Sequence, residues 1–363
     1  MRAMRKQKLI VVLGQTATGK SALAVRLAKK FGGEVISADS RQVYKGLNLG
    51  TGKITKNDRR GVRHHLLDVA NPNKQFSIAL YKKLAERAIG DIFKRGKIPI
   101  ICGGTGFYIK SIVDGLILPE VEPNEELRKK LNNKTTKQLF VILKNLDPRR
   151  AEEIDRNNPR RLIRAIEIAT TLGKVPHLEA KPLSYEVLKI GLTLPSKLLK
   201  QKIYTRLFAR IRLGMVLEAK RLHARGLSWK RMEELGLEYK YLAKYLKNEI
   251  TKKEMLAGIE RDSWLYSKRQ KTWFKRDKKI HWFDPTKKQN LRKKNYKTRI
   301  NKTSLLAVKG GWHRLGASVT HIGILTLLIG CSISVLTGFN GMAQVAENEG
   351  FYLTDLGNKS IQI

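Results

Sequence analysis

The sequence predicts an α/β fold, because short apolar segments typical of buried strands alternate with longer segments of helical periodicity. The predicted strands are residues 9–13, 34–38 and 97–102. Residues 21–31 and 76–94, between those strands, carry apolar side chains at helical spacing. Strands and helices that alternate in this order form a parallel sheet with helices packed on both faces.

The composition changes along the chain, and 363 residues are enough for more than one domain. Residues 1–115 and 201–285 are expected to form the core, and the second of these stretches is strongly helical and basic. Residues 116–200 are charged, mostly helical in pattern and interrupted by prolines. We interpret them as a helical insertion that covers the mouth of the core.

The chain after residue 285 has a different character. Residues 286–310 carry nine Lys or Arg and no acid, which predicts a basic linker over 286–314. The tail, 315–363, is hydrophobic at its start, and its residues 317–339 are about long enough to span the ~30 Å hydrocarbon core of a bilayer as a transmembrane helix. The alternative is a buried tail. A spanning helix with this basic flank would place the preceding part of the chain on the cytoplasmic side.

The charge balance favours a polyanionic partner. The chain has 73 Lys and Arg against 31 Asp and Glu, a net charge of +42, and such an excess repels itself unless a polyanion relieves it. Nucleic acid is the first candidate, because neutralised phosphates release counterions and so supply affinity. A solvated basic surface is the alternative.

The cysteine content excludes two classes of small domain. Cys102 and Cys331 are far apart and neither belongs to a CxxC motif, which excludes a disulfide framework and a zinc-finger ligand set. Two distant thiols fit a reducing compartment. The basic N-terminus leads into an apolar stretch that is too short for a signal peptide.

A phosphate-binding loop follows the first predicted strand and precedes a predicted helix, the context in which G-x-x-x-x-G-K-[ST] is meaningful. Its glycines let backbone N–H groups curl around phosphate oxygens at a helix N-terminus. Lys20 is expected to bridge phosphate oxygens, and the Ser21 hydroxyl to hold a magnesium ion. The predicted phosphate contacts are Gly14, Gln15, Thr16, Ala17, Thr18, Gly19, Lys20 and Ser21. Kinases, ATPases and transferases share this loop.

Three further segments narrow the choice. Asp39 follows the second predicted strand, where an acid faces whatever lies beyond the phosphate. A glycine-rich segment, 103–108, follows the next strand and contains the hydroxyl of Thr105. Residues 266–274 combine cations with three aromatic rings, a composition that suits a nucleic-acid backbone and unpaired bases.

Five segments in this order resemble the tRNA dimethylallyltransferase family: GQTATGKS, ISADSRQVYKGLNLGTGK, CGGTGFYI, NNPRRLIRAIEI and SKRQKTWF. The resemblance covers about residues 8–285 and implies a P-loop NTPase-like core. It also implies a magnesium-dependent enzyme that takes dimethylallyl diphosphate. Such an enzyme alkylates the exocyclic amine of the adenine 3′ of the anticodon in tRNAs that read codons beginning with U. The phosphate loop then holds the diphosphate leaving group.

The resemblance gives roles to three residues of the core. An adenine amine is a poor nucleophile, so a carboxylate within hydrogen-bond reach takes its proton, and Asp39 is our choice for this base. Thr105 is expected near the reacting groups, and Arg206 to complete the diphosphate clamp. The family has R-V-D-x-M before a glycine; this chain lacks the Asp and is shortened there. Counting back from Gly214 selects Arg206, with Arg210 as the alternative.

Contacts with tRNA are also implied by the resemblance. The target base is expected to leave its stack. The implied contacts are Asp39, Ser40, Arg41, Gln42, Thr105, Arg128, Arg160, Arg161, Leu162, Ile163 and Arg164. Ordinary surface charge is the alternative for the arginines. The adjacent His64 and His65 are interpreted as structural or facing RNA, because no metal-ligand spacing surrounds them.

Two other functions fit part of the sequence. A small-molecule kinase would use the same loop with ATP but does not need so basic a surface. A non-catalytic RNA-binding protein does not need Lys20 together with Asp39. We expect a monomer with a cytoplasmic catalytic domain. The tail from residue 312 onward resembles the start of a ResB-type cytochrome c biogenesis membrane protein. We interpret it as either a fused or a mis-joined reading frame that adds a membrane segment, and so a membrane tether, without changing catalysis.

Overall fold

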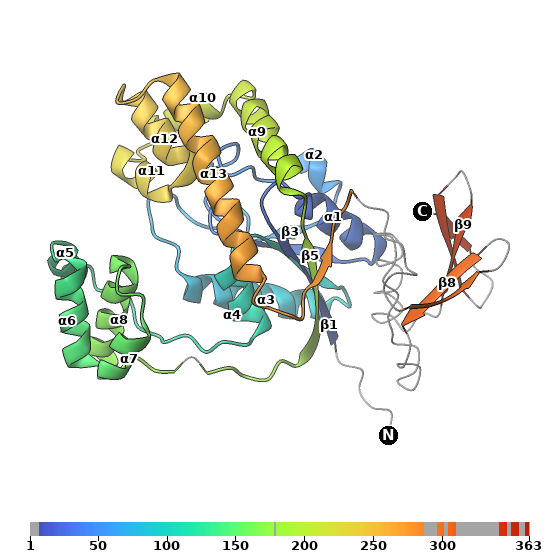
Figure 1. Cartoon of the computed structure of the whole chain (residues 1–363), viewed down its shortest axis with the longest axis horizontal. Coiled ribbons are helices and arrows are strands. Elements are labelled where there is room, and N and C mark those ends of the chain that lie inside the picture. The colour runs from blue at the N-terminus through green and yellow to red at the C-terminus, as the bar shows by residue number, and fades with distance from the viewer. Residues whose placement is uncertain are drawn as a thin grey trace. The chain divides into compact units, whose positions relative to one another are not determined.

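The protein is described by a computed structural model, which covers residues 7–177 and 179–286 in full and five strands farther along the chain. Two compact units are present, one formed by residues 1–109 with 184–363 and the other by residues 110–183. The first unit contains a six-stranded sheet in the order β3-β2-β4-β1-β5-β6, in which every pairing is parallel (Figure 1). The predicted parallel α/β architecture is therefore confirmed.

The predicted strands correspond to β1, β2 and β4, and three others escaped the sequence analysis. The strands of this sheet are β1 (Gln7–Gly14), β2 (Glu34–Ala38), β3 (His64–His65), β4 (Pro99–Gly103), β5 (Tyr185–Leu192) and β6 (His281–Phe283). β5 pairs with β1 along its whole length, from Gln7↔Tyr185 to Gly14↔Leu192. Residues 185–192, which were expected in the insertion, therefore belong to the sheet.

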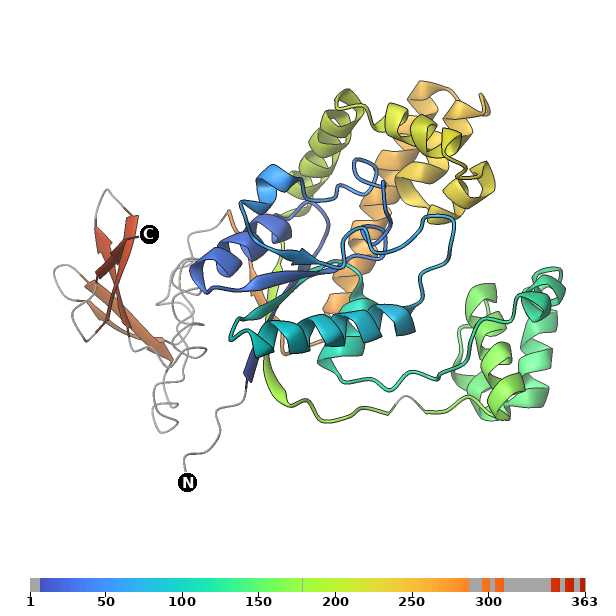
Figure 2. The ribbon, with the colours of Figure 1, turned by 180° about the vertical axis from the view of Figure 1, so that it is seen from behind.

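Helices cover both faces of this sheet. Those that follow the first strands are α1 (Lys20–Lys30), α2 (Lys56–Arg59), α3 (Ile78–Lys94) and α4 (Gly106–Val113). Leu23 and Leu27 of α1 share a buried cluster with Ile10, Val12 and other strand residues. Figure 2 shows α1 and α3 with the sheet strands between them. Apolar burial on this scale is the main force that holds helices to a sheet.

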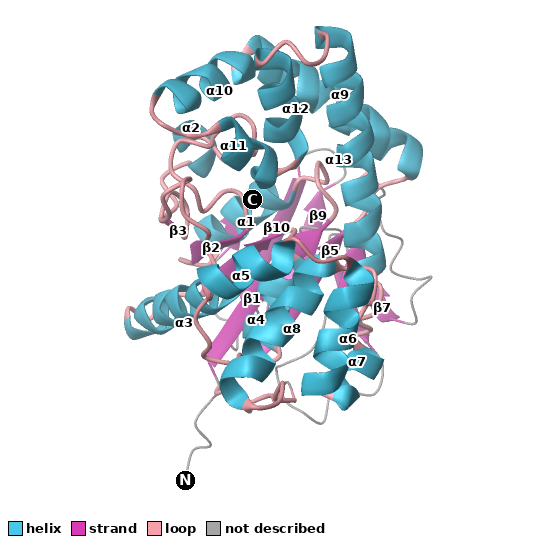
Figure 3. Ribbon diagram, turned by 90° about the vertical axis from the view of Figure 1, so that its left-hand side faces the viewer, coloured by secondary structure: helices cyan, strands magenta, loops and turns pink. Residues whose placement is uncertain are grey.

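A group of five helices completes the first unit (Figure 3). They are α9 (Ser196–Arg212), α10 (Met215–Ala224), α11 (Trp229–Leu235), α12 (Leu237–Leu246) and α13 (Lys252–Phe274). Their shared core also contains Val43, Tyr44 and Leu47, which come from the loop after β2. The segment that follows Asp39 is therefore anchored in these helices.

The second unit is helical, as the sequence predicts, but its limits are 110–183 and not 116–200. Its helices are α5 (Glu125–Asn132), α6 (Thr136–Leu146), α7 (Pro148–Glu153) and α8 (Pro159–Leu172). Leu139, Leu143 and Leu162 are completely buried in its core. Asp147 joins two parts of the unit, because its carboxylate accepts hydrogen bonds from the backbone N–H groups of Arg150 and Val175.

The strands after residue 286 form a separate antiparallel sheet in the order β11-β10-β9-β8-β7. They are β7 (Tyr296–Ile300), β8 (Ser304–Lys309), β9 (Gly341–Ala346), β10 (Gly350–Asp355) and β11 (Ser360–Gln362). The expected linker over 286–314 thus contains two strands. The predicted membrane-spanning segment, 317–339, lies outside the described residues. In the part of the chain that is described, no helix has the length and apolar character needed to cross a bilayer.

Candidate active site

Three loops with polar residues meet at one edge of the main sheet. β2, β4 and β1 are neighbours and run parallel, so the segments that follow them emerge side by side at their carboxyl ends. These segments carry Asp39, Thr105 and the phosphate loop. The carboxyl edge of a parallel sheet is where open α/β folds place their ligands.

The phosphate loop, residues 14–21, has the backbone shape that its glycines permit. Gly14 has φ 133°, and a Cβ there would lie 2.3 Å from the carbonyl oxygen of Leu192, so only glycine fits. Ala17 and Gly19 also have positive φ, and Gly19 is the N-cap of α1. No acid lies in the first turn of α1, so the partial positive charge of its N-terminus is not neutralised from within the helix.

Lys20 lies within the loop and donates a hydrogen bond to the carbonyl of Gln15 at 2.5 Å. Burial lowers the pKa of its ammonium to about 8, an effect that the nearby Cys102 and Asp39 oppose and that Arg206 reinforces. Lys20, Asp39 and Arg206 are thus close enough to influence one another. A partly buried cation that has no acid partner among the described residues is suited to an incoming anion.

Asp39 is half-buried immediately after β2. Its Oδ1 accepts a hydrogen bond from the backbone N–H of Arg41 at 2.9 Å, which caps the turn. Among the hydrogen bonds of the described residues, none involves its Oδ2. The carboxylate therefore has a structural role through one oxygen and an acceptor position left for a substrate proton on the other.

Thr105 connects the loop after β4 with the loop after β2. Its backbone N–H donates to the carbonyl of Ala38 at 3.1 Å, and its hydroxyl accepts from the backbone N–H of Ser40 at 3.0 Å. Tyr266 of α13 hydrogen-bonds the same hydroxyl, and burial raises the pKa of this tyrosine well above its usual range. Thr105 is thus held between the loop after β2 and helix α13.

Helix α13 faces the site with a polar side chain that the sequence analysis missed. Gln270 accepts a hydrogen bond from the backbone N–H of Thr16 at 2.8 Å and donates to the carbonyl of Gly104 at 2.9 Å. Gln15 adds a bond from its amide to the carbonyl of Ser267 at 3.2 Å. The sequence signal was the spacing of Ser263, Ser267, Gln270 and Phe274, which places all four on one buried helix face.

The segment SKRQKTWF, residues 267–274, was predicted from its cations and rings to face RNA, but only part of it is exposed. Ser267, Gln270 and Phe274 are buried, and the Trp273 ring lies against Gly106, where a Cβ would come within 2.2 Å of it. Lys268 and Arg269 are exposed. One face of this helix supports the phosphate loop and the loop after β4. The exposed face carries positive charge, with Lys268 over the Trp264 ring and Arg269 over the Tyr266 ring.

The surroundings of two arginines on α9 separate their roles. Arg210 forms an ion pair with Glu238 at 2.8 Å and donates to the carbonyls of Leu49 and Gly50. Arg206 has no hydrogen bond or ion pair among the described residues, and its guanidinium lies beside Gly52. Desolvation by the surrounding protein lowers the pKa of the Arg206 guanidinium, and the positive charge of the nearby Arg210 lowers it further. Arg206 is thus the side chain with donors left for a ligand, which favours it as the clamp.

The residues around Ser21 are compatible with a metal that also binds the substrate. Ser21 is exposed at the start of α1, and its hydroxyl hydrogen-bonds Cys102, a thiol whose pKa burial raises to about 11. The described residues contain no group of three or more His, Cys, Asp or Glu that could hold a metal on their own. A hydroxyl beside a phosphate loop fits Mg²⁺, which keeps waters and takes substrate phosphates as ligands.

In the second unit, two of the arginines expected to contact RNA have protein partners. Arg128 pairs with the buried carboxylate of Glu167 through two bonds of 2.6 and 2.9 Å. Arg164 donates to Glu167 at 3.2 Å and to the carbonyl of Val121 at 2.8 Å. This geometry favours the alternative of a structural role for both, with Glu167 joining α5 to α8.

The expected contacts of Leu162 and Ile163 need a correction. Their side chains are 0% and 8% exposed and lie in the hydrophobic core of the second unit, so they are not available to RNA. Arg160 and Arg161 occupy the exposed first turn of α8. The implied RNA contact of this segment is thus reduced to these two guanidiniums.

Four other residues near the sheet were predicted to face RNA or to be structural, and their contacts differ. Arg41 and Gln42 are half-buried behind Asp39, and the Gln42 amide approaches the carbonyl of Gly52 at 3.5 Å. His64 bonds the carbonyl of Val62, and His65 bonds Glu34 at 2.7 Å. The structural interpretation of the two histidines therefore fits their contacts.

Comparison with known proteins places this geometry in a family. The model of the IPP transferase family matches residues 42–277, and that of the isopentenyl transferases matches 7–75. A tRNA dimethylallyltransferase of Carboxydothermus hydrogenoformans is 42% identical over 292 residues, which cover 77% of this chain and 93% of that protein. The chain belongs to the IPP transferase family.

Other members of the IPP transferase family agree in sequence and structure. The tRNA dimethylallyltransferase 2 of Treponema denticola is 42% identical and is covered over 96% of its length. The crystal structure of the tRNA isopentenylpyrophosphate transferase of Bacillus halodurans is 37% identical and has a TM-score of 0.58, with 77% of this chain and 90% of that one covered. The ResB-like family model matches residues 265–361, in agreement with the resemblance of the tail.

Proposed function

We propose that this chain transfers a dimethylallyl group from dimethylallyl diphosphate to the exocyclic amine of the adenine 3′ of the anticodon in tRNAs that read U-starting codons. The observation that carries the proposal is the meeting of the phosphate loop, Asp39 and Thr105 at one edge of the sheet, with Arg206 beside them. An anion site and a base lie next to each other there, as an alkylation with an anionic leaving group requires.

In the proposed step a C–N bond forms between the adenine amine and the allyl carbon. The C–O bond to diphosphate breaks, and its electron pair leaves with the diphosphate. Asp39 takes the proton that the amine loses, and Thr105 orients the loop that carries it. Lys20, Arg206 and the backbone N–H groups of the phosphate loop stabilise the negative charge that develops on the leaving group.

Magnesium is part of this proposal. Ser21 would hold the ion together with diphosphate oxygens and water, and the bound ion would supply electrophilic stabilisation of the leaving group. No protein carboxylate cluster is required, in keeping with what the described residues offer. The chain's own cations would stabilise the leaving group in the same way, since Arg206 lies close enough to Lys20 of the loop to lower its pKa.

The RNA partner proposed here is the anticodon stem-loop of tRNA, bound by a monomer in the cytoplasm. A net charge of +42 supports a polyanionic substrate, and Arg160 and Arg161 are exposed for phosphate contacts. The proposed contacts near the target base are Ser40, Arg41 and Gln42, which follow Asp39 directly. Membrane tethering through the tail is not included, because its segment 317–339 lies outside the described residues.

The test is a prenylation assay with a matched variant. The full chain is incubated with Mg²⁺, dimethylallyl diphosphate and unmodified tRNA, and the digested nucleosides are searched by mass spectrometry for prenylated adenosine. Asp39→Asn retains the acceptor for the Arg41 N–H but loses the base, so we expect the rate to fall about 10²–10⁴-fold with tRNA affinity retained. Tight binding of ATP but not of dimethylallyl diphosphate would instead support the kinase alternative.

A further inference from the structure

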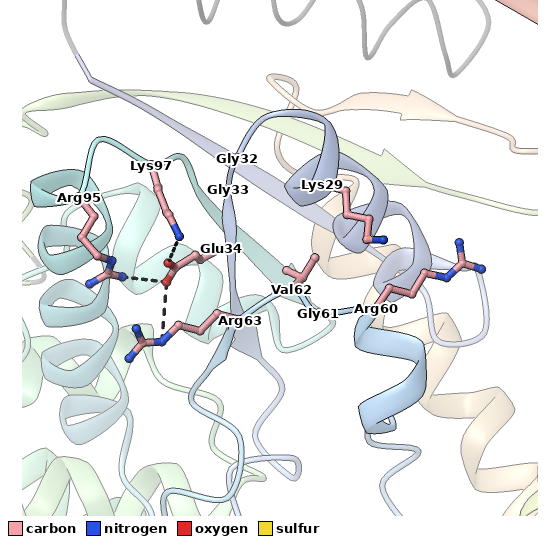
Figure 4. A pocket seen from close by; sticks show the side chains of 10 residues that line it. All are labelled: Lys29, Gly32, Gly33, Glu34, Arg60, Gly61, Val62, Arg63, Arg95 and Lys97. Carbon is pink, nitrogen blue, oxygen red and sulfur yellow. Dashed lines mark hydrogen bonds and ion pairs between the residues drawn. The ribbon is translucent and has the colours of Figure 1, made fainter. Parts of the chain in front are cut away.

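A charged cavity lies at the edge of the main sheet opposite the candidate active site. It has a volume of about 390 Å³ and begins at Glu34, the first residue of β2. Asp39 is five residues farther along, so the cavity is about 16 Å from the candidate base at a rise of ~3.3 Å per residue. Its charged lining consists of five cations and one acid: Lys29, Arg60, Arg63, Arg95, Lys97 and Glu34 (Figure 4).

The single acid does not offset these cations, because close partners already neutralise it. The Glu34 side chain is 2% exposed and accepts hydrogen bonds from Arg95 at 2.8 Å, Lys97 at 3.0 Å and His65 at 2.7 Å. These contacts join the ends of β2, β3 and α3. A structural role therefore accounts for Arg95, Lys97 and His65.

Arg60 and Arg63 are held less firmly than Arg95 and Lys97. Arg63 forms a long ion pair with Glu34 at 4.0 Å, yet its side chain is 66% exposed, so most of its donors remain accessible. Arg60 ends α2 in the left-handed conformation, and its guanidinium has no ion pair among the described residues. Lys29 has a different reason for its position, since a cation in the last turn of α1 is stabilised by the helix C-terminus.

The space between these cations is open. A Cβ at Gly32 or Gly61 would have no neighbour within 4 Å, so the turn glycines leave the cavity unobstructed. Figure 4 shows Lys29 and Arg60 on one side of the Gly32–Gly33 turn and Arg63 on the other, beside Glu34. Cations that flank a gap and do not converge on one point fit successive phosphates of a backbone better than a single phosphate ion.

We propose that this cavity binds backbone phosphates of the tRNA, remote from the alkylated adenine, through Arg60 and Arg63. The proposal goes beyond the reaction and rests on the proposed function only for the identity of the RNA. Guanidinium groups suit the role, because their planar donors bind phosphate oxygens in pairs.

The experiment measures the salt dependence of tRNA binding for the full chain and for Arg60→Gln/Arg63→Gln. Each lost phosphate contact lowers the slope of log K against log[salt] by about 0.7–0.9, so we expect a decrease of about 1.5 and about tenfold weaker binding at 0.1 M salt. Lys252→Gln/Lys253→Gln removes the same charge from the exposed start of α13 and serves as the control. It is expected to change the slope by less than about 0.5.

Two results would overturn the proposal. If the slope of log K against log[salt] decreased equally in both double variants, only the net charge of the protein would matter for tRNA binding. The other result is an unchanged slope for tRNA binding in Arg60→Gln/Arg63→Gln. If inorganic phosphate then raised the melting temperature of the wild type but not of this variant, the cavity would be a site for free phosphate. Prenylation by the wild-type chain is measured in parallel. Absence of product from the wild type would count against the proposed function, while the binding slopes still test the cavity.

Discussion

The side chain of Gln270 joins the backbone N–H of Thr16 to the carbonyl of Gly104 through bonds of 2.8 and 2.9 Å. One residue of α13 thus fixes the spacing between the phosphate loop and the loop after β4. Gln270 is 5% exposed, which limits the access of water to these bonds. Gln270 is therefore a positioning residue for the two loops that the proposed reaction uses.

Replacing Gln270 with alanine is expected to impair both stability and activity. The change leaves a buried N–H and a buried carbonyl without partners, which costs about 1–3 kcal/mol each when neither finds water. We expect a lower free energy of unfolding in urea. A displacement of ~1 Å between the loops would lower kcat/KM for dimethylallyl diphosphate by about 10²-fold.

Two variants make this prediction specific. Gln270→Glu retains an acceptor for Thr16 but loses the donor to Gly104, so its kcat/KM should lie between those of the wild type and Gln270→Ala. Lys275→Ala changes an exposed residue just beyond the helix and should behave as the wild type does. A Gln270→Ala enzyme with unchanged kcat/KM would show that the loops keep their spacing without this bridge.

The order of the first strands and the phosphate loop were predictable because local pattern determines them. Apolar runs mark β1, β2 and β4, and the glycine spacing marks the loop. β5 escaped because it contains the charged Lys189, whose burial is satisfied by Asp277 at 2.7 Å. The Gln270 bridge spans 254 residues of sequence, and such a pairing leaves no local signal.

Arg206 and Arg210 should respond differently to truncation. Arg206→Ala removes a cation that no protein partner uses, so we expect kcat/KM to fall about 10²-fold or more with little change in stability. Arg210→Ala breaks the ion pair with Glu238 and two bonds to the loop at residues 49–50, so its main effect should be on urea unfolding. The opposite pattern would assign the clamp to Arg210.

The Glu34 cluster should make the protein sensitive to acid. Burial raises the pKa of this carboxyl, but hydrogen bonds from His65, Lys97 and Arg95 outweigh that effect and lower it to about 2, from an ordinary 4.5. The stability it contributes is present above the unfolded pKa near 4.5 and is lost as the pH falls toward 2. Glu34→Gln should lower the free energy of unfolding at pH 7 by about 2 kcal/mol and flatten its decline below pH 4.5. Parallel acid profiles for both proteins would contradict this assignment.

Lys20 should set the alkaline limit of the reaction. Burial lowers the pKa of its ammonium to about 8 in the free protein, and only the protonated form can hold diphosphate. We therefore expect kcat/KM for dimethylallyl diphosphate to be level just below pH 8 and to fall about tenfold per pH unit above it. Bound diphosphate stabilises the ammonium, so the decline of kcat should begin at higher pH than that of kcat/KM. Lys20→Arg keeps a charge that does not titrate in this range and should lack the decline near pH 8, even if its rate is lower. A decline that persists in Lys20→Arg would mean that a different group titrates.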